Sequence, residues 1–483
     1  MIAMDASVDP RTGEAGRSFA WTSDVEVDST MTRAAAARRS VADALPGERA
    51  EWLRALAEGM RSRAHELVDI GVRETGLAAD ALAGEVEYAA HNLEYYASIA
   101  EQVRFRGERS DTGPPPGIRV RESIPLGVVL VFGASNFPLG FGVLGHDTAS
   151  AIAAGCPVVA KLHPAHPELS TLLAEIAADA LTAAGAPAGV FGCVRGFQPG
   201  LQLLDHPEAA AVAFTGSTRG GLAIAERCQP RGIPVFAEMG TVNPVLVDVS
   251  WPRSEDPALI AEFVSCLTDR AGQFCTKPGM LLIPRARFDG SGLIDELARV
   301  RSEPLLTSDI AARYRSTVGA LARNGHRLLT GAPAVEAGSH VRATVLVTDA
   351  EGFLDTPELL EECFGPFGIV CLYETRDDVD RVLHRLQPCL AFSVFADPES
   401  SVDGLRALAR AGARKAGRVV FNAWPTGIPI SFAQHHGGPW PAASRADATS
   451  VGAAALERFV RPVTFQDWPP RIGSPLARTE TTA

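Results

Sequence analysis

A cysteine lies in a polar, glycine-flanked loop of this 483-residue sequence. Cys275 occurs in the stretch AGQFCTKPG, between Gly272 and Gly279. A thiol exposed at such a loop can ionise and attack an electrophilic carbon, whereas the alternative is a buried, inert thiol. No histidine lies within forty residues of it, so a cysteine peptidase pairing would have to recruit His435 or His436 from far along the chain.

Two polar side chains follow apolar stretches that are typical of strands. Glu238 lies near the end of PVFAEM, and Asn136 lies in GASNFP. Open parallel sheets place their sites at the carboxyl ends of strands. A partly desolvated carboxylate there has a raised pKa and can act as a general base, and an amide N–H there can stabilise an oxyanion. A helix-capping or ion-paired glutamate and a turn asparagine are the alternatives.

A third group of residues could bind phosphate. The stretch FTGSTRGG ends an expected strand and opens a helix at Gly216 and Ser217, where backbone N–H groups can meet a pyrophosphate. This stretch does not match the GxGxxG motif of dinucleotide-binding sites, and alone it is weak evidence for a phosphate site. Lys161, one of three lysines in the chain, ends the stretch PVVAK and could bind a phosphate or a ribose hydroxyl. Pro164 stands where an NAD site commonly has a carboxylate, which leaves room for a 2′-phosphate.

The elements that must position these residues are strands alternating with helices. Apolar residues at helical spacing predict helices from Ser29 to about Arg104. Two strand and helix series follow, separated by a polar break at 252–257. The predicted strands are 127–132, 157–161, 188–194, 210–215 and 234–239 in the first series and 280–283, 369–373 and 392–395 in the second. Nearly continuous apolar strands of this kind indicate parallel sheets covered on both faces, so the predicted fold class is α/β with two tandem, doubly wound Rossmann-like domains.

The composition excludes several classes of partner. Lys and Arg number 45 against 57 Asp and Glu, a net charge of −12 without a basic run, so neither nucleic acid nor an anionic membrane surface is expected to bind. The apolar stretch 125–145 contains glycines and prolines and predicts a strand, a loop and a helix start rather than a membrane span. No secretory signal opens the sequence, so the eight cysteines are expected to be reduced thiols of a cytoplasmic protein. Their spacing fits no zinc motif, and no metal is expected.

Taken together, the motifs resemble those of the aldehyde dehydrogenase superfamily in their order along the chain. GASNFP, VVAKLHP, FTGS, FAEMG, GQFCT and EECFGP follow one another within 120–469, most of the chain. The stretches PVFAEMGTVNPV, FNAWPTGIPISFAQHHGGPWPAAS and FVRPVTFQDWP are similar to the branch that oxidises 2-oxoglutarate semialdehyde, also called 2,5-dioxopentanoate. The resemblance implies NAD(P)-dependent oxidation of an aldehyde to a carboxylic acid.

The resemblance also implies a role for each catalytic residue. Cys275 would attack the aldehyde to give a thiohemiacetal, and Asn136 with the Cys275 backbone N–H would hold the oxyanion. Hydride transfer to the nicotinamide would leave a thioester, and Glu238 would activate the water that hydrolyses it.

A second set of residues would hold the cofactor, which is NADP or NAD, with NADP favoured by Pro164. The implied contacts are Lys161 at the adenosine ribose or its phosphate, Gly216 and Ser217 at the pyrophosphate, Glu362 at the nicotinamide ribose, and Ser135 and Phe364 beside them. A 2′-phosphate would be bound by Arg195 or Arg219.

The substrate pocket has two candidate linings. A dicarboxylic semialdehyde needs a cation at the distal end of the pocket, and Arg270 is the candidate, with a structural ion pair as its alternative role. The aromatic residues Phe137, Phe141, Trp424 and Phe432 could instead line an apolar tunnel for aliphatic or aromatic aldehydes.

One residue departs from the branch pattern, which usually has asparagine two residues after the nucleophile. Here the residue is Lys277, and its ammonium could lower the pKa of Cys275 or point away from it. Two further alternatives are a relative that passes the thioester to CoA, which the presence of Glu238 disfavours, and a catalytically silent structural or binding relative.

The resemblance finally implies a domain division and an assembly. The cofactor-binding domain would comprise 1–112 and 126–240, the catalytic domain 241–452, and a small β oligomerisation lobe 113–125 and 453–483. A homodimer or homotetramer that takes a small-molecule aldehyde is expected.

Overall fold

The protein begins with a short hairpin and four helices. The computed structural model describes residues 3–102, 109–111, 119–253, 256–334 and 337–469. The hairpin pairs β1 (Met4–Val8) with β2 (Ala15–Ala20), and the helices are α1 (Asp24–Asp43), α2 (Pro46–Ser62), α3 (Ala64–Thr75) and α4 (Ala79–Gln102). The helices occupy the region where helical spacing predicted them. The hairpin was not predicted, because β2 is exposed along nearly its whole length and has no alternating apolar pattern.

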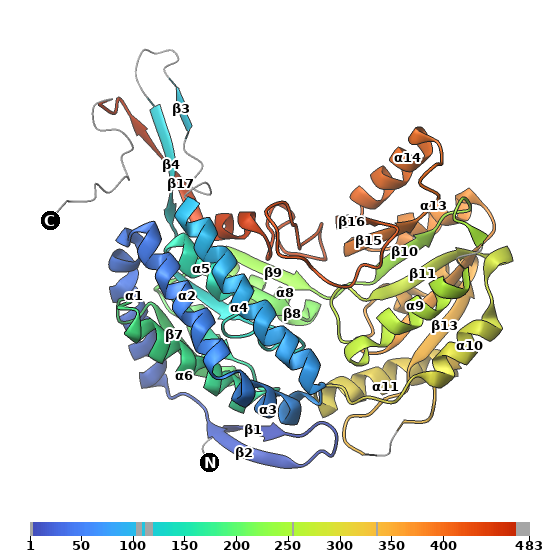
Figure 1. Cartoon of the computed structure of the whole chain (residues 1–483), viewed down its shortest axis with the longest axis horizontal. Helices are drawn as coiled ribbons and strands as arrows, with labels where there is room; N and C mark the ends of the chain where they lie inside the picture. Colours follow the sequence, from blue (N-terminus) through green and yellow to red (C-terminus); the bar gives the residue numbers. More distant parts are fainter. Residues whose placement is uncertain (1–2, 103–108, 112–118, 254–255, 335–336, 470–483) are drawn as a thin grey trace.

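A parallel sheet of five strands follows, and helices cover both of its faces (Figure 1). Its order is β7-β6-β5-β8-β9, and β5 contributes Val129 and Val131 to one hydrophobic core and Val128 and Leu130 to the other. The strands are β5 (Val128–Phe132), β6 (Val158–Leu162), β7 (Phe191–Arg195), β8 (Ala209–Gly216) and β9 (Val235–Met239). The helices are α5 (His146–Ala154), α6 (Pro167–Ala183), α7 (Phe197–Asp205) and α8 (Thr218–Cys228). The strand order reverses between β5 and β8, and sheets of this kind bind ligands at the carboxyl end of that switch point.

A second sheet of seven strands has the order β12-β13-β14-β11-β10-β15-β16, parallel except for the edge strand β12. The strands are β10 (Asn243–Val247), β11 (Pro278–Pro284), β12 (Leu328–Thr330), β13 (Thr344–Asp349), β14 (Phe367–Tyr373), β15 (Cys389–Phe395) and β16 (Ala416–Phe421). The helices are α9 (Asp256–Thr268), α10 (Gly290–Arg299), α11 (Ser308–Arg323), α12 (Ala350–Leu354), α13 (Arg376–Arg385) and α14 (Val402–Ala413). The sheet therefore has the predicted α/β class, with a mixed edge.

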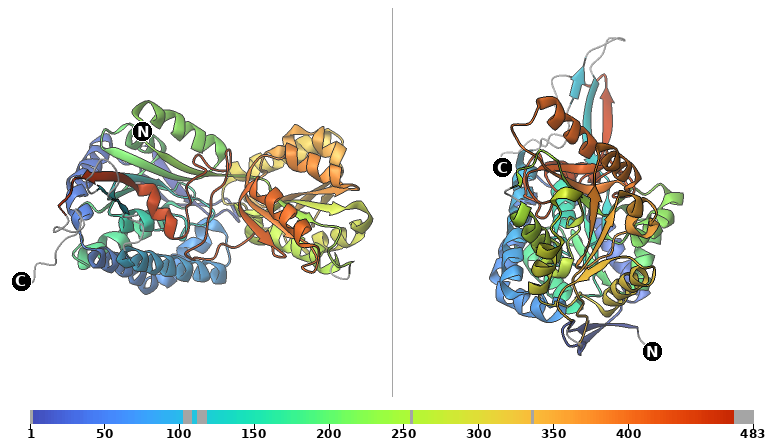
Figure 2. Two further views of the ribbon diagram at one scale, coloured as in Figure 1. Left: turned by 90° about the horizontal axis from the view of Figure 1, so that it is seen from above. Right: turned by 90° about the vertical axis from the view of Figure 1, so that its right-hand side faces the viewer.

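The connection between the sheets determines which of their edges meet. β9 ends at Met239 and β10 begins at Asn243, so the carboxyl edge of the first sheet faces the amino edge of the second. The two α/β units lie side by side, and the irregular segment between β16 and β17 runs between them (Figures 1 and 2). Loops that precede strands of the second sheet are thereby brought to the ends of strands of the first.

A third, antiparallel sheet projects from the first unit (Figure 1). It has the order β17-β4-β3, with β3 (Arg109–Asp111), β4 (Arg119–Pro125) and β17 (Val460–Gln466). The two strand regions that the lobe prediction names therefore pair with each other, while residues 113–118 and 470–483 of that lobe lie outside the described residues. Among the described helices, none is long and apolar enough to cross a membrane.

Candidate active site

A thiol, an imidazole and a carboxylate meet where the two sheets face each other. The Sγ of Cys275 lies 3.6 Å from Nε2 of His436, and the same nitrogen lies 2.7 Å from Oε1 of Glu238. Sγ, Nε2 and a carboxylate oxygen all lie within 4.8 Å of one another. The structure thus brings together the predicted Cys275 and Glu238, and it adds His436 between them.

Three different parts of the chain position this cluster. Glu238 lies on β9, where the segment around Ala443 pairs with the strand and fixes it. Ser450 donates its hydroxyl to Oε2 of Glu238 at 2.7 Å, and the backbone N–H of His436 donates to Thr449 at 2.8 Å. The segment between β16 and β17 therefore both supplies the imidazole and orients the carboxylate.

The ionisation of the two acidic groups follows from this arrangement. Burial raises the pKa of the Cys275 thiol well above its usual value, and the negative charges of Glu238 and Glu362 raise it further. For Glu238, burial raises the pKa, but His436 and the Ser450 hydroxyl outweigh it, and the pKa is lowered overall. The sequence expectation of a raised pKa for Glu238 was wrong, because it did not include the two hydrogen-bond donors that stabilise the carboxylate.

Asn136 lies beside the thiol loop. Its Nδ2 donates one hydrogen bond to the main-chain carbonyl of Gln273 at 2.7 Å. An amide nitrogen has two N–H groups, so this bond orients the side chain and leaves a second donor. Asn136 is nearly buried, as an oxyanion donor must be to act in a low dielectric.

The loop that carries Cys275 has an unusual backbone. Arg270 and Ala271 have φ angles of 49° and 56°, in the left-handed region, and Gly272 follows at 69°. A Cβ atom at Gly272 would lie 2.4 Å from the carbonyl oxygen of Gly365, so only glycine permits this approach. The thiol loop is therefore packed directly onto the loop that follows Glu362.

Lys277 joins the same two loops. Its Nζ donates to the carbonyl oxygens of Cys363, Gly365 and Phe367 at 2.9, 2.7 and 3.0 Å. The ammonium is committed to these carbonyls, and the pKa of Cys275 is raised rather than lowered. The idea that Lys277 activates the thiol is therefore wrong.

A cavity of about 720 Å³ opens onto Cys275 and Glu238. Its walls come from α4, from the segment after β5, from the thiol loop and from 426–430. Phe137 and Phe141 line it, as predicted residues, together with Tyr88 and Phe274. Most of the wall is therefore apolar.

Two predicted pocket residues lie elsewhere. The Trp424 indole donates to Glu262 at 2.7 Å and packs against Phe263 of α9 and Phe395 of β15, which both belong to the core on the α9 side of the second sheet. Phe432 is exposed and does not line the cavity. Both assignments to the pocket were wrong.

Arg270 lines the cavity and is also ion paired. Its Nη1 lies 2.7 Å from Oε2 of Glu85, and its guanidinium stacks on the Phe137 ring at 4.3 Å. The other oxygen of Glu85 accepts the backbone N–H groups of Leu139 and Gly140 at 2.9 and 3.1 Å. The negative charge of Glu85 is thus shared among three donors, and Arg270 is the single Lys or Arg among the described residues that line this cavity.

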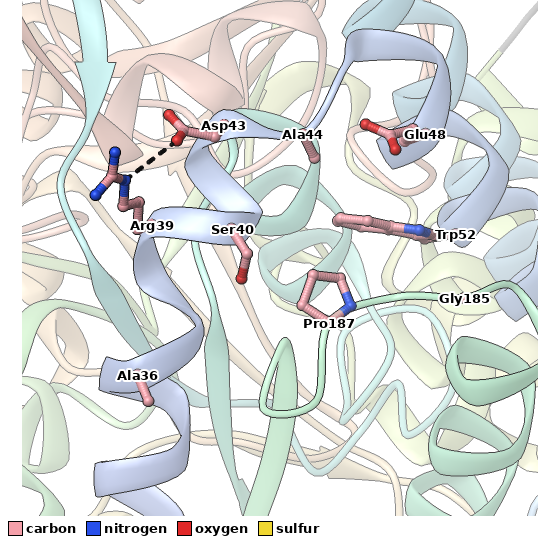
Figure 3. A pocket seen from close by; sticks show the side chains of 9 residues that line it. All are labelled: Ala36, Arg39, Ser40, Asp43, Ala44, Glu48, Trp52, Gly185 and Pro187. Atoms are coloured by element: carbon pink, nitrogen blue, oxygen red, sulfur yellow. Dashed lines mark ion pairs between the residues drawn. The ribbon is translucent and has the colours of Figure 1, made fainter. Parts of the chain in front are cut away.

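A second pocket lies at the surface between α1, the start of α2 and the loop at Gly185 and Pro187 (Figure 3). Arg39 and Asp43 form an ion pair at 3.6 Å on its wall. None of its lining residues lines the catalytic cavity, and it contains neither cysteine nor histidine.

The residues predicted to hold the cofactor lie at strand ends of the first sheet and on the loop before β14. Gly216 ends β8 and is exposed, and Ser217 caps α8 by accepting the N–H of Gly220 at 3.2 Å. Lys161 lies near the end of β6, where burial lowers its pKa to about 8. Ser135 follows β5 and is partly exposed. These positions surround the switch point between β5 and β8.

The two arginines considered for a 2′-phosphate differ in exposure. Arg195 is nearly buried, donates to Pro167 and Thr171, and stacks over Phe19 at 4.6 Å. Arg219 is exposed in the first turn of α8.

Glu362 and Phe364 lie on the loop before β14. Oε1 of Glu362 is buried with no hydrogen-bond partner among the described residues, and burial raises its pKa to about 7. A Cβ atom at Gly240 would lie 1.9 Å from Oε2 of Glu362, so the carboxylate rests directly on that glycine. An unpartnered buried acceptor is what a ribose hydroxyl could satisfy, so these residues fit a dinucleotide.

Sequence reasoning missed several residues of the site. His436 was considered only as a distant partner in a peptidase, although the stretch HHGGPWPAAS could have drawn attention to it. Ser450 and Glu85 lie in stretches without a distinguishing pattern, and only the fold brings them to the site.

Comparisons with known proteins agree with this geometry. The sequence profile described as "Aldehyde dehydrogenase family" matches residues 4–460. Alpha-ketoglutaric semialdehyde dehydrogenase 2 of Azospirillum brasilense is 36% identical over 469 residues, which cover 92% of this chain and 88% of that protein. Alpha-ketoglutaric semialdehyde dehydrogenase of Acinetobacter baylyi is 36% identical over 433 residues, 87% of this chain and 82% of that protein. The structure of an aldehyde dehydrogenase C mutant of Pseudomonas syringae, complexed with NAD+ and octanal, matches 97% of this chain and 94% of its own at 23% identity with a TM-score of 0.84.

Proposed function

The chain belongs to the aldehyde dehydrogenase family, and on that premise we propose that it oxidises 2-oxoglutarate semialdehyde to 2-oxoglutarate. Membership makes it an NAD(P)-dependent oxidoreductase that acts on an aldehyde. The observation that supports this substrate assignment is the position of Arg270, whose guanidinium lines the catalytic cavity beside Phe137 and Phe274. The two relatives at 36% identity, both named for alpha-ketoglutaric semialdehyde, a synonym of the proposed substrate, support it.

Cys275 is the proposed nucleophile, and its proton needs an acceptor. Nε2 of His436 is 3.6 Å from Sγ, and Oε1 of Glu238 is 2.7 Å from the same nitrogen. The pair His436 and Glu238 takes the thiol proton as one coupled acceptor, while the sulfur forms a bond to the aldehyde carbon.

The oxygen of the resulting thiohemiacetal is held by Asn136 and by the Cys275 backbone N–H. The bond from Asn136 to Gln273 fixes the amide before the charge develops, which is the condition for electrostatic stabilisation. The chemistry that NAD(P) supplies when bound is acceptance of a hydride, which leaves the substrate as a thioester on Cys275.

The pair of His436 and Glu238 first releases the thiol proton to solvent through the cavity that Glu238 lines. Glu238 then accepts a proton from the water that attacks the thioester, and this proton returns to the Cys275 sulfur when the bond to sulfur breaks. Its lowered pKa keeps the carboxylate ionised at neutral pH, and Ser450 and His436 fix its direction. Water adds to the carbonyl carbon, the bond to sulfur breaks, and the acid leaves while Cys275 is regenerated. Retention of this carboxylate supports hydrolysis over transfer to CoA.

The residues proposed to hold the cofactor are those at the switch point and on the β14 loop. Gly216 and Ser217 would meet the pyrophosphate, Lys161 the adenosine ribose or its phosphate, and Glu362, with Phe364 and Ser135 near it, the nicotinamide ribose. NADP is the proposed preference, because Pro164 provides no carboxylate and Arg219 is exposed at the start of α8.

A second candidate substrate class is apolar aldehydes. Four aromatic rings line the cavity, and Glu85 forms an ion pair with Nη1 of Arg270. An aliphatic or aromatic aldehyde would use this wall without contacting the guanidinium.

The test is kcat/KM for 2-oxoglutarate semialdehyde and for hexanal, in the wild type and in Arg270→Gln. A charge-assisted contact is worth about 1.5 to 3 kcal/mol, so the wild type should prefer the semialdehyde at least about tenfold. Arg270→Gln should lose this preference and keep its activity on hexanal, and Arg270→Lys should retain part of the preference. Comparable values for both aldehydes in the wild type would contradict the assignment.

The assembly and location are proposed on separate grounds. The projecting sheet β17-β4-β3 offers edge strands to a second copy, which supports a homodimer or homotetramer. All eight cysteines are free thiols, which supports a cytoplasmic location. Light scattering after size-exclusion chromatography would measure the assembly, and a monomer would contradict it.

A further inference from the structure

We propose that Cys275, His436 and Glu238 form a binding site for a thiophilic divalent cation such as Zn²⁺, which reversibly blocks the catalytic thiol. The sequence predicted no metal site, because metal motifs are recognised by close spacing and these three residues come from distant parts of the chain. The inference goes beyond the proposed substrate and does not depend on it.

The distances already approach those of a metal site. Zinc bonds of about 2.3 Å to sulfur and about 2.0 Å to nitrogen at a tetrahedral angle put the two ligand atoms about 3.5 Å apart. Sγ of Cys275 and Nε2 of His436 are 3.6 Å apart. Oε1 of Glu238 is 2.7 Å from that nitrogen and would have to move away by less than about 1 Å to reach ligand spacing.

One buried polar atom in the cluster, Nδ1 of His436, has no hydrogen-bond partner among the described residues. His436 and Glu238 are both nearly inaccessible to solvent, and Oε1 of Glu238 lies 2.7 Å from Nε2 of His436. This contact is a hydrogen bond only while the ring carries a proton on Nε2. A cation would satisfy Oε1 and Nε2 together whatever the tautomer.

The charge balance of the cluster also favours a cation. The cluster's three side chains are a carboxylate, an imidazole and a thiol, and a thiol binds a metal as the thiolate. A divalent cation offsets the negative charges of the carboxylate and the thiolate, and its binding displaces the thiol proton, so one proton leaves for each cation bound.

The cation can reach the site, and its fourth position can hold water. Cys275 and Glu238 both line the 720 Å³ cavity, which opens to solvent, so a hydrated ion has a path to them. Three protein ligands and one open position are typical of an accessible zinc site. Because the sulfur is then a metal ligand, an aldehyde cannot form a bond to it.

The experiment uses Co²⁺ as a spectroscopic probe of the full-length protein. Co²⁺ bound to a thiolate should give a near-ultraviolet charge-transfer band at one equivalent, and the band should be absent in Cys275→Ala. His436→Gln should weaken Co²⁺ binding at least tenfold. Cys266→Ala and His435→Gln, which alter a thiol and an imidazole outside the cluster, should bind as the wild type does. No band, or the same affinity in His436→Gln, would overturn the proposal.

A second measurement needs no cysteine variant. Zn²⁺ should slow alkylation of Cys275 by iodoacetamide, located by peptide mass spectrometry, and a chelator should restore it. His436→Gln should lose most of this protection. Equal protection in the wild type and in His436→Gln would show that Zn²⁺ binds the thiol without the imidazole, and it would refute the proposed site. Neither readout requires turnover, so failure here is distinct from failure of the substrate assignment.

Discussion

Replacing Lys277 with methionine should weaken the packing between the loop that carries Cys275 and the loop that follows Glu362. The ammonium donates to three carbonyls on the segment after Glu362 and is almost completely buried. Methionine has a similar length and no donor, so the substitution removes the three hydrogen bonds and little packing.

The magnitude follows from two of the three carbonyls, because the carbonyl of Gly365 also accepts the N–H of Phe367 at 2.8 Å. Each buried acceptor left without a donor costs about 1 to 3 kcal/mol. Methionine also avoids the burial of an ammonium, whose cost is evident in the lowered pKa of Lys277. We therefore expect a net loss near the lower end, about 2 kcal/mol. With a slope of about 3 kcal/mol per M this is a shift of roughly 0.7 M in the urea midpoint.

Urea unfolding and cofactor KM together test the reasoning. Since Glu362 lies at the start of the loosened segment, KM for NAD(P) should rise at least fivefold, while the Cys275 thiol titration should not change. Lys415→Met is the matched control, because Lys415 also donates to two carbonyls, those of His384 and Leu386, but on a partly exposed surface. Equal midpoint shifts for the two variants, with an unchanged KM, would refute the account.

Three further predictions concern the cofactor and the oxyanion. Gly240→Ala places a Cβ 1.9 Å from Oε2 of Glu362, so the carboxylate must move and KM for NAD(P) should rise tenfold or more; an unaltered KM would contradict the contact. Burial lowers the pKa of Lys161 to about 8, so its positive charge is present below that pH and lost above it. KM for NADP should therefore rise between pH 7 and 9 in the wild type and stay level in Lys161→Met, and parallel profiles would disprove the role. Asn136→Ala should lower kcat/KM by a factor of about 10² to 10³, and a loss below tenfold would remove Asn136 from the oxyanion site.

Local sequence predicted the parallel strands that carry the site, because apolar runs between helices have few other ways to be buried. The strand ends then indicated where Glu238, Asn136 and Lys161 would lie, since carboxyl ends of parallel strands share one edge. The hairpin β1 and β2 was missed because its pairing relies on backbone hydrogen bonds between largely exposed residues.

The environment of each site residue could not be predicted in the same way. His436 and Ser450 reach Glu238 through an irregular segment with no periodic pattern, so their effect on its pKa was missed. Lys277 could point either way from its position in the chain, and the three carbonyls that hold it become neighbours only in the folded protein. Trp424 was assigned to the pocket by its type alone and belongs to the α9 side of the core.

Covalent catalysis at Cys275 is the central claim, and rapid mixing of enzyme, NAD(P) and aldehyde tests it most directly. The wild type should release a burst of one NAD(P)H per active site, and Glu238→Gln should give the burst with slow turnover afterwards. Quenching that variant during the burst should leave an acyl group on the peptide that contains Cys275, found by mass spectrometry. A burst without an acyl adduct on Cys275, or no burst with any aldehyde, would contradict the account.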